Sequence, residues 1–221
     1  MKDRYHDNSR KEMIAFITTE PKRVLEIGSG TGKFRNHFNE DIEYWGIEPD
    51  ITSADIACKV NKMKVIVGSV PSVDKLIPND YFDLIVCNDV IEHIQDTKEV
   101  FNFIESKLTK NGKIIASIPN VRYLPNLKEL LLFKDWRYRQ AGILDRTHLR
   151  FFTKKSSLRM LNENNFHIIK YHGINSIYEG GNIWRRILNR IKYFIPILIL
   201  GQDTQYLQFG FAIEKRSNNL I

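Results

Sequence analysis

The sequence has little cysteine and no long apolar run, and both absences restrict the kind of protein that it encodes. Its two cysteines, Cys58 and Cys87, are too few for a disulfide scaffold and form no CxxC pair that would suggest a metal. We therefore expect buried free thiols in a reducing compartment. The longest apolar run, residues 193–200, contains Pro196 and is much shorter than the roughly 20 residues that a membrane-spanning helix requires.

Signals for export and for division into domains are also missing. The first 13 residues are too charged for a signal peptide, which favours a cytoplasmic location. No linker rich in Pro, Gly or Ser, no repeat and no charge block divides the 221 residues, so we expect one domain over residues 1–221. Hydrophobic residues make up 43% of the chain, which is enough for a sizeable core.

The net charge of +7 is unevenly distributed. Residues 121–155 contain nine Lys and Arg against three Asp and Glu. A basic patch of this kind attracts phosphate, nucleic acid or an anionic membrane surface, and it also occurs as a solubilising face without a partner. The charge alone leaves these interpretations open.

Short apolar segments that end at Gly, Asn or Pro predict buried strands of a parallel sheet, at residues 23–28, 44–48, 64–68, 82–88 and 113–118. Helical patterns lie between them, at residues 33–38, 53–61 and 97–108. We expect Asn111-Gly112 to act as the C-terminal cap of the last helix. Strands that alternate with helices indicate βαβ units with right-handed crossovers.

The second half predicts helices at residues 124–133 and 155–162 and strands at residues 167–173 and 206–215. The last strand alternates apolar and polar residues, as an antiparallel strand would. We expect a doubly wound, Rossmann-like α/β fold. Its seven-stranded sheet would be mostly parallel, with an antiparallel edge strand and helices on both faces.

Residues 121–155 and 174–203 are predicted insertions on the substrate side. The second contains a helix at residues 184–192 with an apolar stripe and a basic side. Peripheral membrane contact through residues 183–200 is one interpretation. Packing of the stripe on its own domain is the commoner use of such a helix, and we favour it here.

The most informative motif covers residues 24–34, where a buried strand runs into a glycine-rich turn and then a helix. A phosphate-binding P-loop is excluded, because Ile27 stands where its first glycine belongs and Phe34 replaces its Ser or Thr. A dinucleotide-binding GxGxxG turn fits only in part, because Lys33 occupies the third glycine position. The pattern E-x-G-x-G-x-G matches at every fixed position, namely Glu26, Gly28, Gly30 and Gly32.

This motif resembles that of class I S-adenosylmethionine-dependent methyltransferases. The resemblance implies that the turn, with Ser29, wraps the methionine part of S-adenosylmethionine. It also implies that Glu26 helps to hold the ammonium group. A carboxylate is electrostatically favourable beside a sulfonium and ammonium ligand, whereas it would repel a pyrophosphate.

Two further turns fit an adenosine ligand. Glu48, followed by Pro49, ends the second predicted strand 20 residues after Gly28, where a carboxylate can accept hydrogen bonds from both ribose hydroxyls. Dinucleotide enzymes place an acid similarly, so Glu48 does not choose between the two ligands. Ser69 and Val70 follow the third strand and, by the resemblance, lie along the adenine; an ordinary surface turn is the alternative.

Residues 82–94 resemble the motif that follows the fourth strand of these methyltransferases. The resemblance places Asn88 and Asp89 at the carboxyl end of the strand, beside the methionine and the methyl group. His93 lies in the next turn and is a candidate catalytic residue. A structural histidine bonded to the backbone is the alternative interpretation.

Residues 144–153, with the sequence LDRTHLRFFT, resemble a segment of methyltransferases associated with polysaccharide or glycan assembly. We predict that His148 removes a proton from an attacking hydroxyl and that Asp145 orients it. In the structural alternative, Asp145 pairs with Arg146 and His148 packs against Phe152.

The N-terminal residues 1–20 include a predicted helix at residues 11–18, which the resemblance implies is a lid over the cofactor. Arg10 would then pair with the methionine carboxylate of the cofactor, since Arg suits bidentate recognition of carboxylates. A solvated charge at the start of the helix is the alternative.

These motifs predict an S-adenosylmethionine-dependent methyltransferase that acts on a small-molecule or sugar hydroxyl, with a role in polysaccharide or glycan biosynthesis. A quinone-like metabolite is the near alternative acceptor. A nicotinamide-dependent oxidoreductase and a non-catalytic cofactor-binding scaffold are the alternatives from other classes. We expect no nucleic acid partner, because no recognition module is present. We also expect no metal, because the His and acid residues lack ligand spacing.

Overall fold

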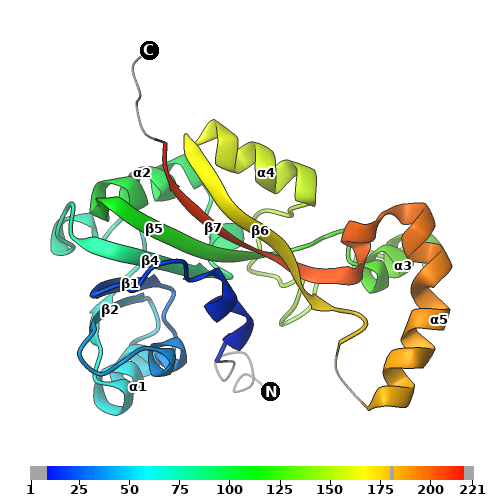
Figure 1. Ribbon diagram of the computed structural model, residues 1–221, viewed down its shortest axis with the longest axis horizontal. Helices are drawn as coiled ribbons and strands as arrows, with labels where there is room; N and C mark the ends of the chain where they lie inside the picture. Colours follow the sequence, from blue (N-terminus) through cyan, green and yellow to red (C-terminus); the bar gives the residue numbers. More distant parts are fainter. Residues whose placement is uncertain (1–8, 180–181, 217–221) are drawn as a thin grey trace.

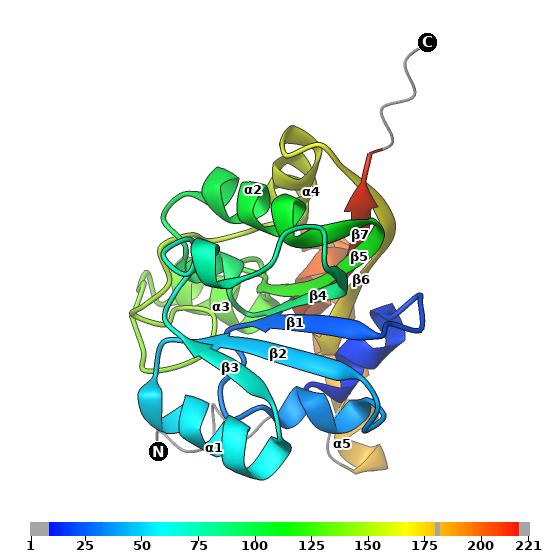
Figure 2. The same ribbon diagram turned by 90° about the vertical axis from the view of Figure 1, so that its left-hand side faces the viewer.

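A computed structural model describes residues 9–179 and 182–216 as a seven-stranded sheet with helices on both faces (Figures 1 and 2). The strands are β1 (Arg23–Ile27), β2 (Glu43–Glu48), β3 (Lys64–Val67), β4 (Phe82–Asn88), β5 (Leu108–Pro119), β6 (Phe166–Ser176) and β7 (Tyr206–Lys215). The α-helices are α1 (Ile51–Asn61), α2 (Thr97–Lys107), α3 (Leu124–Leu132), α4 (Lys154–Glu163) and α5 (Ile183–Leu200). The 3₁₀ helices are η2 (Lys11–Phe16), η3 (Lys33–His37), η4 (Asp74–Leu76), η5 (Ile91–His93) and η6 (Gln202–Gln205).

The sheet has the order β3-β2-β1-β4-β5-β7-β6, and β1 to β5 pair in parallel. Strand β7 is antiparallel to both of its neighbours, β5 and β6. The predicted fold, a mostly parallel seven-stranded sheet with antiparallel pairing at one edge, is confirmed. Strand β7, which is inserted between β5 and β6, is well buried, and β6 is the outer strand of this edge.

The central strands are apolar throughout because helices cover both of their faces. Helices α2 and α4 lie on one face, and α1 and η2 lie on the other (Figure 1). Along β4, Ile85 and Cys87 belong to the core under α2, whereas Leu84 and Val86 belong to the core that includes Met13 of η2. This alternation fixes the register of the strand.

Both cysteines are free, as predicted, but only Cys87 is buried. Cys58 is exposed on α1, so the prediction that both thiols are buried is wrong for this residue. Its position explains the difference: α1 buries Ser53, Ala54 and Ala57 against the sheet, and Cys58 follows directly on the outer side.

Several element boundaries differ from the predicted ones. Residues 11–18 and 33–38 form only the short 3₁₀ helices η2 and η3. The Asn111-Gly112 pair is not a helix cap, because α2 ends at Lys107 and both residues lie inside β5. A Cβ atom on Gly112 would lie 2.7 Å from the Leu108 side chain, so close packing within the strand requires this glycine.

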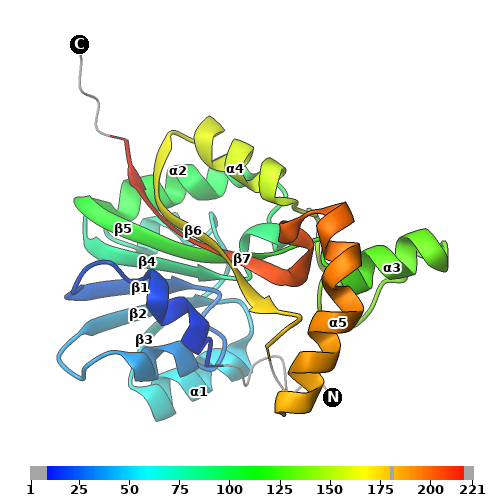
Figure 3. The ribbon, with the colours of Figure 1, turned by 45° about the vertical axis from the view of Figure 1, so that its right-hand side comes forward.

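The carboxyl ends of the parallel strands meet at one edge of the sheet, and the order reverses between β1 and β4. This switch point is where doubly wound sheets bind their ligands. Strand β5 leads into α3, and β6 leads toward α5, so both helices lie beyond this edge (Figures 1 and 3). The predicted substrate-side insertions, residues 121–155 and 174–203, contain these two helices.

The apolar stripe of α5 is exposed, which contradicts the favoured prediction that it packs on its own domain. Trp184, Leu188 and Ile191 are at least 64% exposed, and Ile197 is the buried residue of the helix. Ile197 packs with Leu124 of α3. The remainder of α5 extends away from the sheet (Figure 3). Over residues 9–179 and 182–216, no helix combines the length and the apolarity needed to cross a membrane.

Helix η2 is fixed to the sheet by Met13 and Phe16, which are both buried. Phe16 lies over β7 at Gly210, where an added Cβ atom would be only 2.6 Å from the ring carbon Cζ. This glycine therefore makes room for the aromatic ring that holds the N-terminal segment in place.

We predict that Gly210→Ala lowers the free energy of unfolding by about 1–3 kcal/mol, because Phe16 must move to accept the new methyl group. Urea unfolding measures the change. In the Phe16→Ala background the same substitution is expected to cost much less, since the clash is gone. An equal cost in both backgrounds would show that the ring contact is not the cause.

Candidate active site

The glycine-rich turn after β1 is held in a left-handed backbone conformation. The φ angles of Gly28, Gly30 and Gly32 are 71°, 52° and 78°. A Cβ atom on Gly28 would lie 2.7 Å from the Val90 side chain, so the turn requires glycine on two grounds. The N–H groups of Gly28 and Ser29 donate to the Ile47 carbonyl at 2.8 and 3.2 Å, which ties the turn to the end of β2.

Glu48 lies at the end of β2 and is oriented by backbone donors. The Gly30 N–H donates to one carboxylate oxygen at 2.7 Å, and the Asp50 N–H donates to the other at 2.9 Å. Each oxygen keeps acceptor capacity beyond these bonds, because an ionised carboxylate has about four lone-pair positions. The carboxylate therefore has a fixed position in which it can accept hydrogen bonds from ribose hydroxyls.

The other residues predicted to contact the adenosine surround Glu48. Pro49 follows it and is exposed. The Gly68 N–H donates to the Glu48 carbonyl at 3.1 Å, so the turn with Ser69 and Val70 lies beside it. Ser69 is exposed, and Val70 is partly buried against the core.

Glu26 is a buried carboxyl group on β1 that accepts a hydrogen bond from a tyrosine. The Tyr44 hydroxyl donates to it at 3.0 Å, and Glu26 is only 4% exposed. Burial raises the pKa of Glu26 to about 8, and the nearby charge of Glu48 adds to the effect. The group therefore holds a proton near neutral pH, and a cation placed beside it would favour the ionised form.

Two side chains near the carboxyl ends of β1 and β4 have buried polar atoms without a hydrogen-bond partner. They are the hydroxyl of Ser29 and both the nitrogen and the oxygen of the Asn88 amide. Buried polar atoms are nearly always paired, so unpaired ones at the switch point indicate positions where a ligand supplies the partner.

Asp89 connects four parts of the chain. Its carboxylate accepts hydrogen bonds from the Arg10 guanidinium, from the Ser117 hydroxyl at 2.9 Å and from the Gln208 amide at 2.7 and 2.9 Å. Arg10 also pairs with Glu12 at 3.0 Å, so the alternative of a solvated arginine is wrong. That Arg10 pairs with the cofactor carboxylate stays a prediction.

The loop with His148 is bound to η5 by main-chain hydrogen bonds. The Glu92 carbonyl accepts from the N–H groups of Leu149 at 2.9 Å and Arg150 at 3.1 Å. This contact brings His148 against His93, with ring centroids 4.7 Å apart and nearly perpendicular planes. The structure thus joins two predicted catalytic residues that are 55 positions apart in the sequence.

Asp145 does not orient His148, and this part of the prediction is wrong. The Asp145 carboxylate instead accepts from the backbone N–H and the hydroxyl of Thr147, at 2.8 and 2.6 Å, and so shapes the loop. The His148 ring is held by the Ile143 carbonyl, 2.9 Å from Nδ1. Besides His93, the ring that faces His148 is that of Phe151, with ring centroids 6.4 Å apart.

Glu92 belongs to the motif at residues 82–94 and lies beside both histidines, which makes it a further candidate site residue. It is fully buried, and neither carboxylate oxygen has a hydrogen-bond partner. Burial, together with the charge of Asp89, raises the pKa of Glu92 well above its usual value. The His148 Nε2 atom lies 3.9 Å from it and is also unpaired.

Ser117, Gln208 and Tyr44 also contact site carboxylates and were not predicted. Each lies in an apolar strand with no local motif, and its role follows only from which strands are neighbours. Burial and the neighbouring His148 lower the pKa of His93, so the neutral imidazole predominates there.

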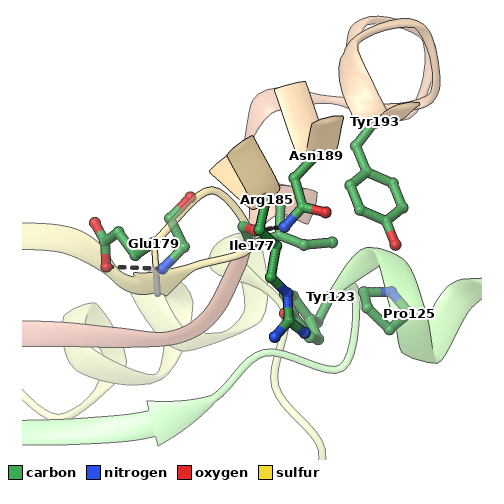
Figure 4. Close-up of a pocket in the computed structure, with 8 residues that line it drawn as sticks. Tyr123, Pro125, Ile177, Glu179, Arg185, Asn189 and Tyr193 are labelled. Atoms are coloured by element: carbon green, nitrogen blue, oxygen red, sulfur yellow. Dashed lines mark hydrogen bonds between the residues drawn. The ribbon is translucent and has the colours of Figure 1, made fainter. Parts of the chain in front are cut away.

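A cavity of about 360 Å³ lies beyond the carboxyl edge of the sheet, between α5, the start of α3 and the end of β6 (Figure 4). Gln208 links this cavity to Asp89. Its side-chain N–H donates to Asp89, and its side-chain oxygen accepts a hydrogen bond of 2.8 Å from Asn175, which directly precedes the lining residue Ser176. The lining residues are mostly polar: Tyr123, Pro125, Ser176, Ile177, Glu179, Arg185, Asn189 and Tyr193.

A family model described as a methyltransferase domain matches residues 3–171, more than half of the chain. The chain belongs to the methyltransferase family. An uncharacterized protein of Methanocaldococcus jannaschii is 31% identical over 163 residues, which cover 73% of each chain. The histidine protein methyltransferase 1 homolog of Dictyostelium discoideum is 33% identical over 112 residues, 44% of this chain but only 35% of that protein.

Solved structures show the same fold. A methyltransferase structure from Archaeoglobus fulgidus, described as dependent on S-adenosylmethionine, has a TM-score of 0.66 and 18% identity over 97% of this chain and 95% of that chain. A methyltransferase from Thermotoga maritima, described as a possible histamine N-methyltransferase, has a TM-score of 0.62 and 14% identity over 96% and 89%.

This methyltransferase uses S-adenosylmethionine as its cofactor. The nicotinamide-dependent oxidoreductase and the non-catalytic scaffold, considered as alternatives from the sequence, are set aside. The residues present fit the cofactor chemically: a glycine turn that a Cβ atom would obstruct, buried carboxyl groups at Glu26 and Glu48, and unpaired polar atoms on Ser29 and Asn88.

We predict that cofactor binding near pH 7 releases a proton from Glu26. Glu26 holds this proton in the free protein because its pKa is about 8. The ammonium group of the ligand favours the ionised carboxylate instead. Affinity should therefore rise as the pH increases toward 8. Calorimetric titration with S-adenosylhomocysteine, in buffers of different ionisation enthalpy, measures the proton count.

Glu26→Gln is the matched control, because it keeps the shape and removes the titration. Proton release should be smaller in this variant than in the unmodified protein by a measurable fraction of one proton. The same proton count in both proteins would contradict the assignment of Glu26.

Proposed function

We propose that this methyltransferase transfers the methyl group of S-adenosylmethionine to a hydroxyl of a small molecule or sugar, in the assembly of a polysaccharide or other glycan. The observation that carries the proposal is the unpaired Nε2 atom of His148. Because a carbonyl can only accept, Nδ1 of His148 donates its hydrogen to Ile143, and Nε2 retains its lone pair.

Hydroxyl groups need such an acceptor more than amines do, because a hydroxyl must lose its proton to become a good nucleophile. His148 is 5% exposed, and His93 and Glu92 lie next to it. The expected reaction is one in-line displacement: the bond from the acceptor oxygen to the methyl carbon forms while the carbon–sulfur bond breaks. The electron pair goes to sulfur, and the hydroxyl proton goes to His148.

The bound cofactor supplies an electrophilic methyl carbon, so the chain mainly has to align the acceptor with it. Asn88 and Asp89, at the end of β4, lie one turn before Glu92 and His93. The short helix η5 carries the chain from these residues to His93, which supports an acceptor position near the histidine pair.

The cavity between α3 and α5 supports a sugar acceptor. Its Glu179, Asn189 and tyrosine side chains offer both donors and acceptors of the kind that bind hydroxyl groups. Arg185 adds a cation that suits the phosphate of a nucleotide-linked or lipid-linked sugar. A sugar, with its several hydroxyl groups, would use more of these groups than a largely apolar quinone-like acceptor, so a glycan is the favoured class.

We predict that His148→Ala lowers kcat by about 10²-fold or more, which is the usual contribution of a positioned general base. Transfer of labelled methyl from S-adenosylmethionine to fractionated glycans, lipid-linked sugars and metabolites measures it. The affinity for S-adenosylhomocysteine should stay unchanged. The matched control is His167→Ala, because His167 is exposed on β6.

The idea of a hydroxyl acceptor fails if the label appears only on amines or thiols. The assignment of His148 fails if both histidine variants transfer methyl groups at the rate of the unmodified enzyme.

We also propose that α5 contacts the surface of an anionic membrane. Its exposed apolar side chains lie on a helix that also carries Arg185, Arg186, Arg190 and Lys192 and no acidic residue. A helix of this composition binds at the lipid interface through apolar burial and through attraction to anionic headgroups. A membrane surface would bring the enzyme to a lipid-linked acceptor.

We predict that the protein sediments with vesicles that contain phosphatidylglycerol but not with pure phosphatidylcholine, and that added salt weakens this binding. Leu188→Asp should reduce binding at least about tenfold, because it places a charge at the lipid-facing surface. Ile51→Asp is the matched control on α1, since the exposed fractions of the two side chains are similar, 64% and 71%. Equal binding by both variants, or no binding by the unmodified protein, would contradict the contact.

A further inference from the structure

Glu92, His93 and His148 form a compact group of potential metal ligands. One ligand-type atom from each residue lies within 4.8 Å of those of the other two. Glu92 and His93 are neighbours on η5, and His148 reaches them from the loop before α4. Sequence spacing gives no hint of this group, because its third member is 55 residues away.

The two histidine rings are held in the same way. Nδ1 of His148 faces the Ile143 carbonyl at 2.9 Å, and Nδ1 of His93 faces the Thr147 carbonyl at 3.2 Å. Since carbonyls only accept, each Nδ1 carries the hydrogen, and each Nε2 presents a lone pair. Metal-binding histidines are usually fixed by such a hydrogen bond from their other ring nitrogen.

The Glu92 carboxyl group supplies an independent argument. It is completely buried, and neither oxygen has a hydrogen-bond partner. A proton would neutralise its charge, but the new O–H group would still lack a hydrogen bond, because the His148 Nε2 lone pair lies 3.9 Å from the nearer oxygen. A cation neutralises the carboxylate charge and also binds the oxygen lone pairs, so it offsets both the buried charge and the missing hydrogen bonds.

We propose that Glu92, His93 and His148 bind one divalent transition-metal ion. Two imidazoles and one carboxylate suit Zn²⁺, Mn²⁺ or Co²⁺, whereas Mg²⁺ and Ca²⁺ prefer oxygen ligands. Zinc sites in enzymes commonly use three protein ligands of this kind and leave one position open. This replaces the expectation from the sequence that the protein has no metal site.

Only a small movement is needed to close the site. With metal–ligand bonds of about 2.0–2.2 Å in a tetrahedral arrangement, the ligand atoms would be about 3.3–3.6 Å apart. Nε2 of His148 and the nearest Glu92 oxygen are now 3.9 Å apart. The main-chain bonds from Leu149 and Arg150 to the Glu92 carbonyl already hold the two segments together.

The role of the ion rests on the proposed hydroxyl acceptor. Its open position would bind the acceptor oxygen and lower the pKa of the hydroxyl, so that the proton passes to water. The oxygen–methyl bond then forms as the methyl–sulfur bond breaks. The ion would thus take over the proton-removing role of the His148 lone pair, which becomes a metal bond.

The test uses the full chain without a histidine tag, first stripped with a chelator and then given Zn²⁺, Mn²⁺ or Co²⁺. After desalting, elemental analysis should find about one ion per chain for at least one of the metals. The melting temperature should rise with metal concentration, because binding to the folded state alone is stabilising. Bound Co²⁺ should add visible absorption bands that free Co²⁺ lacks.

Glu92→Gln and His148→Gln should each weaken binding at least about tenfold, since a neutral amide is a much poorer ligand than a carboxylate or an imidazole. His167→Gln is the matched control, and it should bind as the unmodified protein does. The proposal is overturned if none of the three metals binds, or if both ligand variants bind as tightly as the control.

This outcome is separable from the proposed function. Stoichiometric metal binding without methyl transfer to any hydroxyl would leave the metal site standing and remove the hydroxyl acceptor. If the stripped protein binds none of the metals and still methylates a hydroxyl at an unchanged rate, the hydroxyl acceptor stands and the metal site is removed.

Discussion

The structure depends on how it compensates the acidic side chains of Glu26, Glu48, Asp89 and Glu92 near the carboxyl ends of its parallel strands. Glu48 is held by two backbone N–H groups, and Asp89 is held by Arg10, Ser117 and Gln208. Glu26 accepts one hydrogen bond from the Tyr44 hydroxyl, and Glu92 has no hydrogen-bond partner. Burying a charge without compensation costs several kcal/mol, so burial raises the pKa of the last two groups, and a cation beside either would favour its ionised form.

We assign one of these two positions to the cofactor and the other to the methyl acceptor. The cation expected beside Glu26 is the ammonium group of S-adenosylmethionine, and the one proposed beside Glu92 is a metal ion that would bind the acceptor. Asp89, with its fully paired carboxylate, lies between them in the chain and joins η2, β4, β5 and β7. Because Asp89 is followed closely by η5, this node also holds the start of the segment that leads to Glu92 and His93.

The proposed acceptor side consists of the parts of the chain that follow β5 and β6. The start of α3, the end of β6 and α5 line one polar cavity, and α5 continues past it as an exposed apolar and basic helix. An acceptor that combines a polar sugar with a lipid carrier would use both features at the same time. The cavity and the exposed helix therefore support the same proposed substrate, a sugar on a lipid carrier.

The sequence by itself determined the fold and the cofactor. Continuous apolar strands between helices allow only a covered parallel sheet, and the spacing of Glu26, Gly28, Gly30, Gly32 and Glu48 is set by contacts within one βαβ unit. The tertiary structure alone decided that His148 meets Glu92 and His93, that Gln208 holds Asp89, and that the stripe of α5 is left uncovered. Those contacts join residues far apart in the chain, and no local pattern of side chains encodes which loop or strand becomes the neighbour of another.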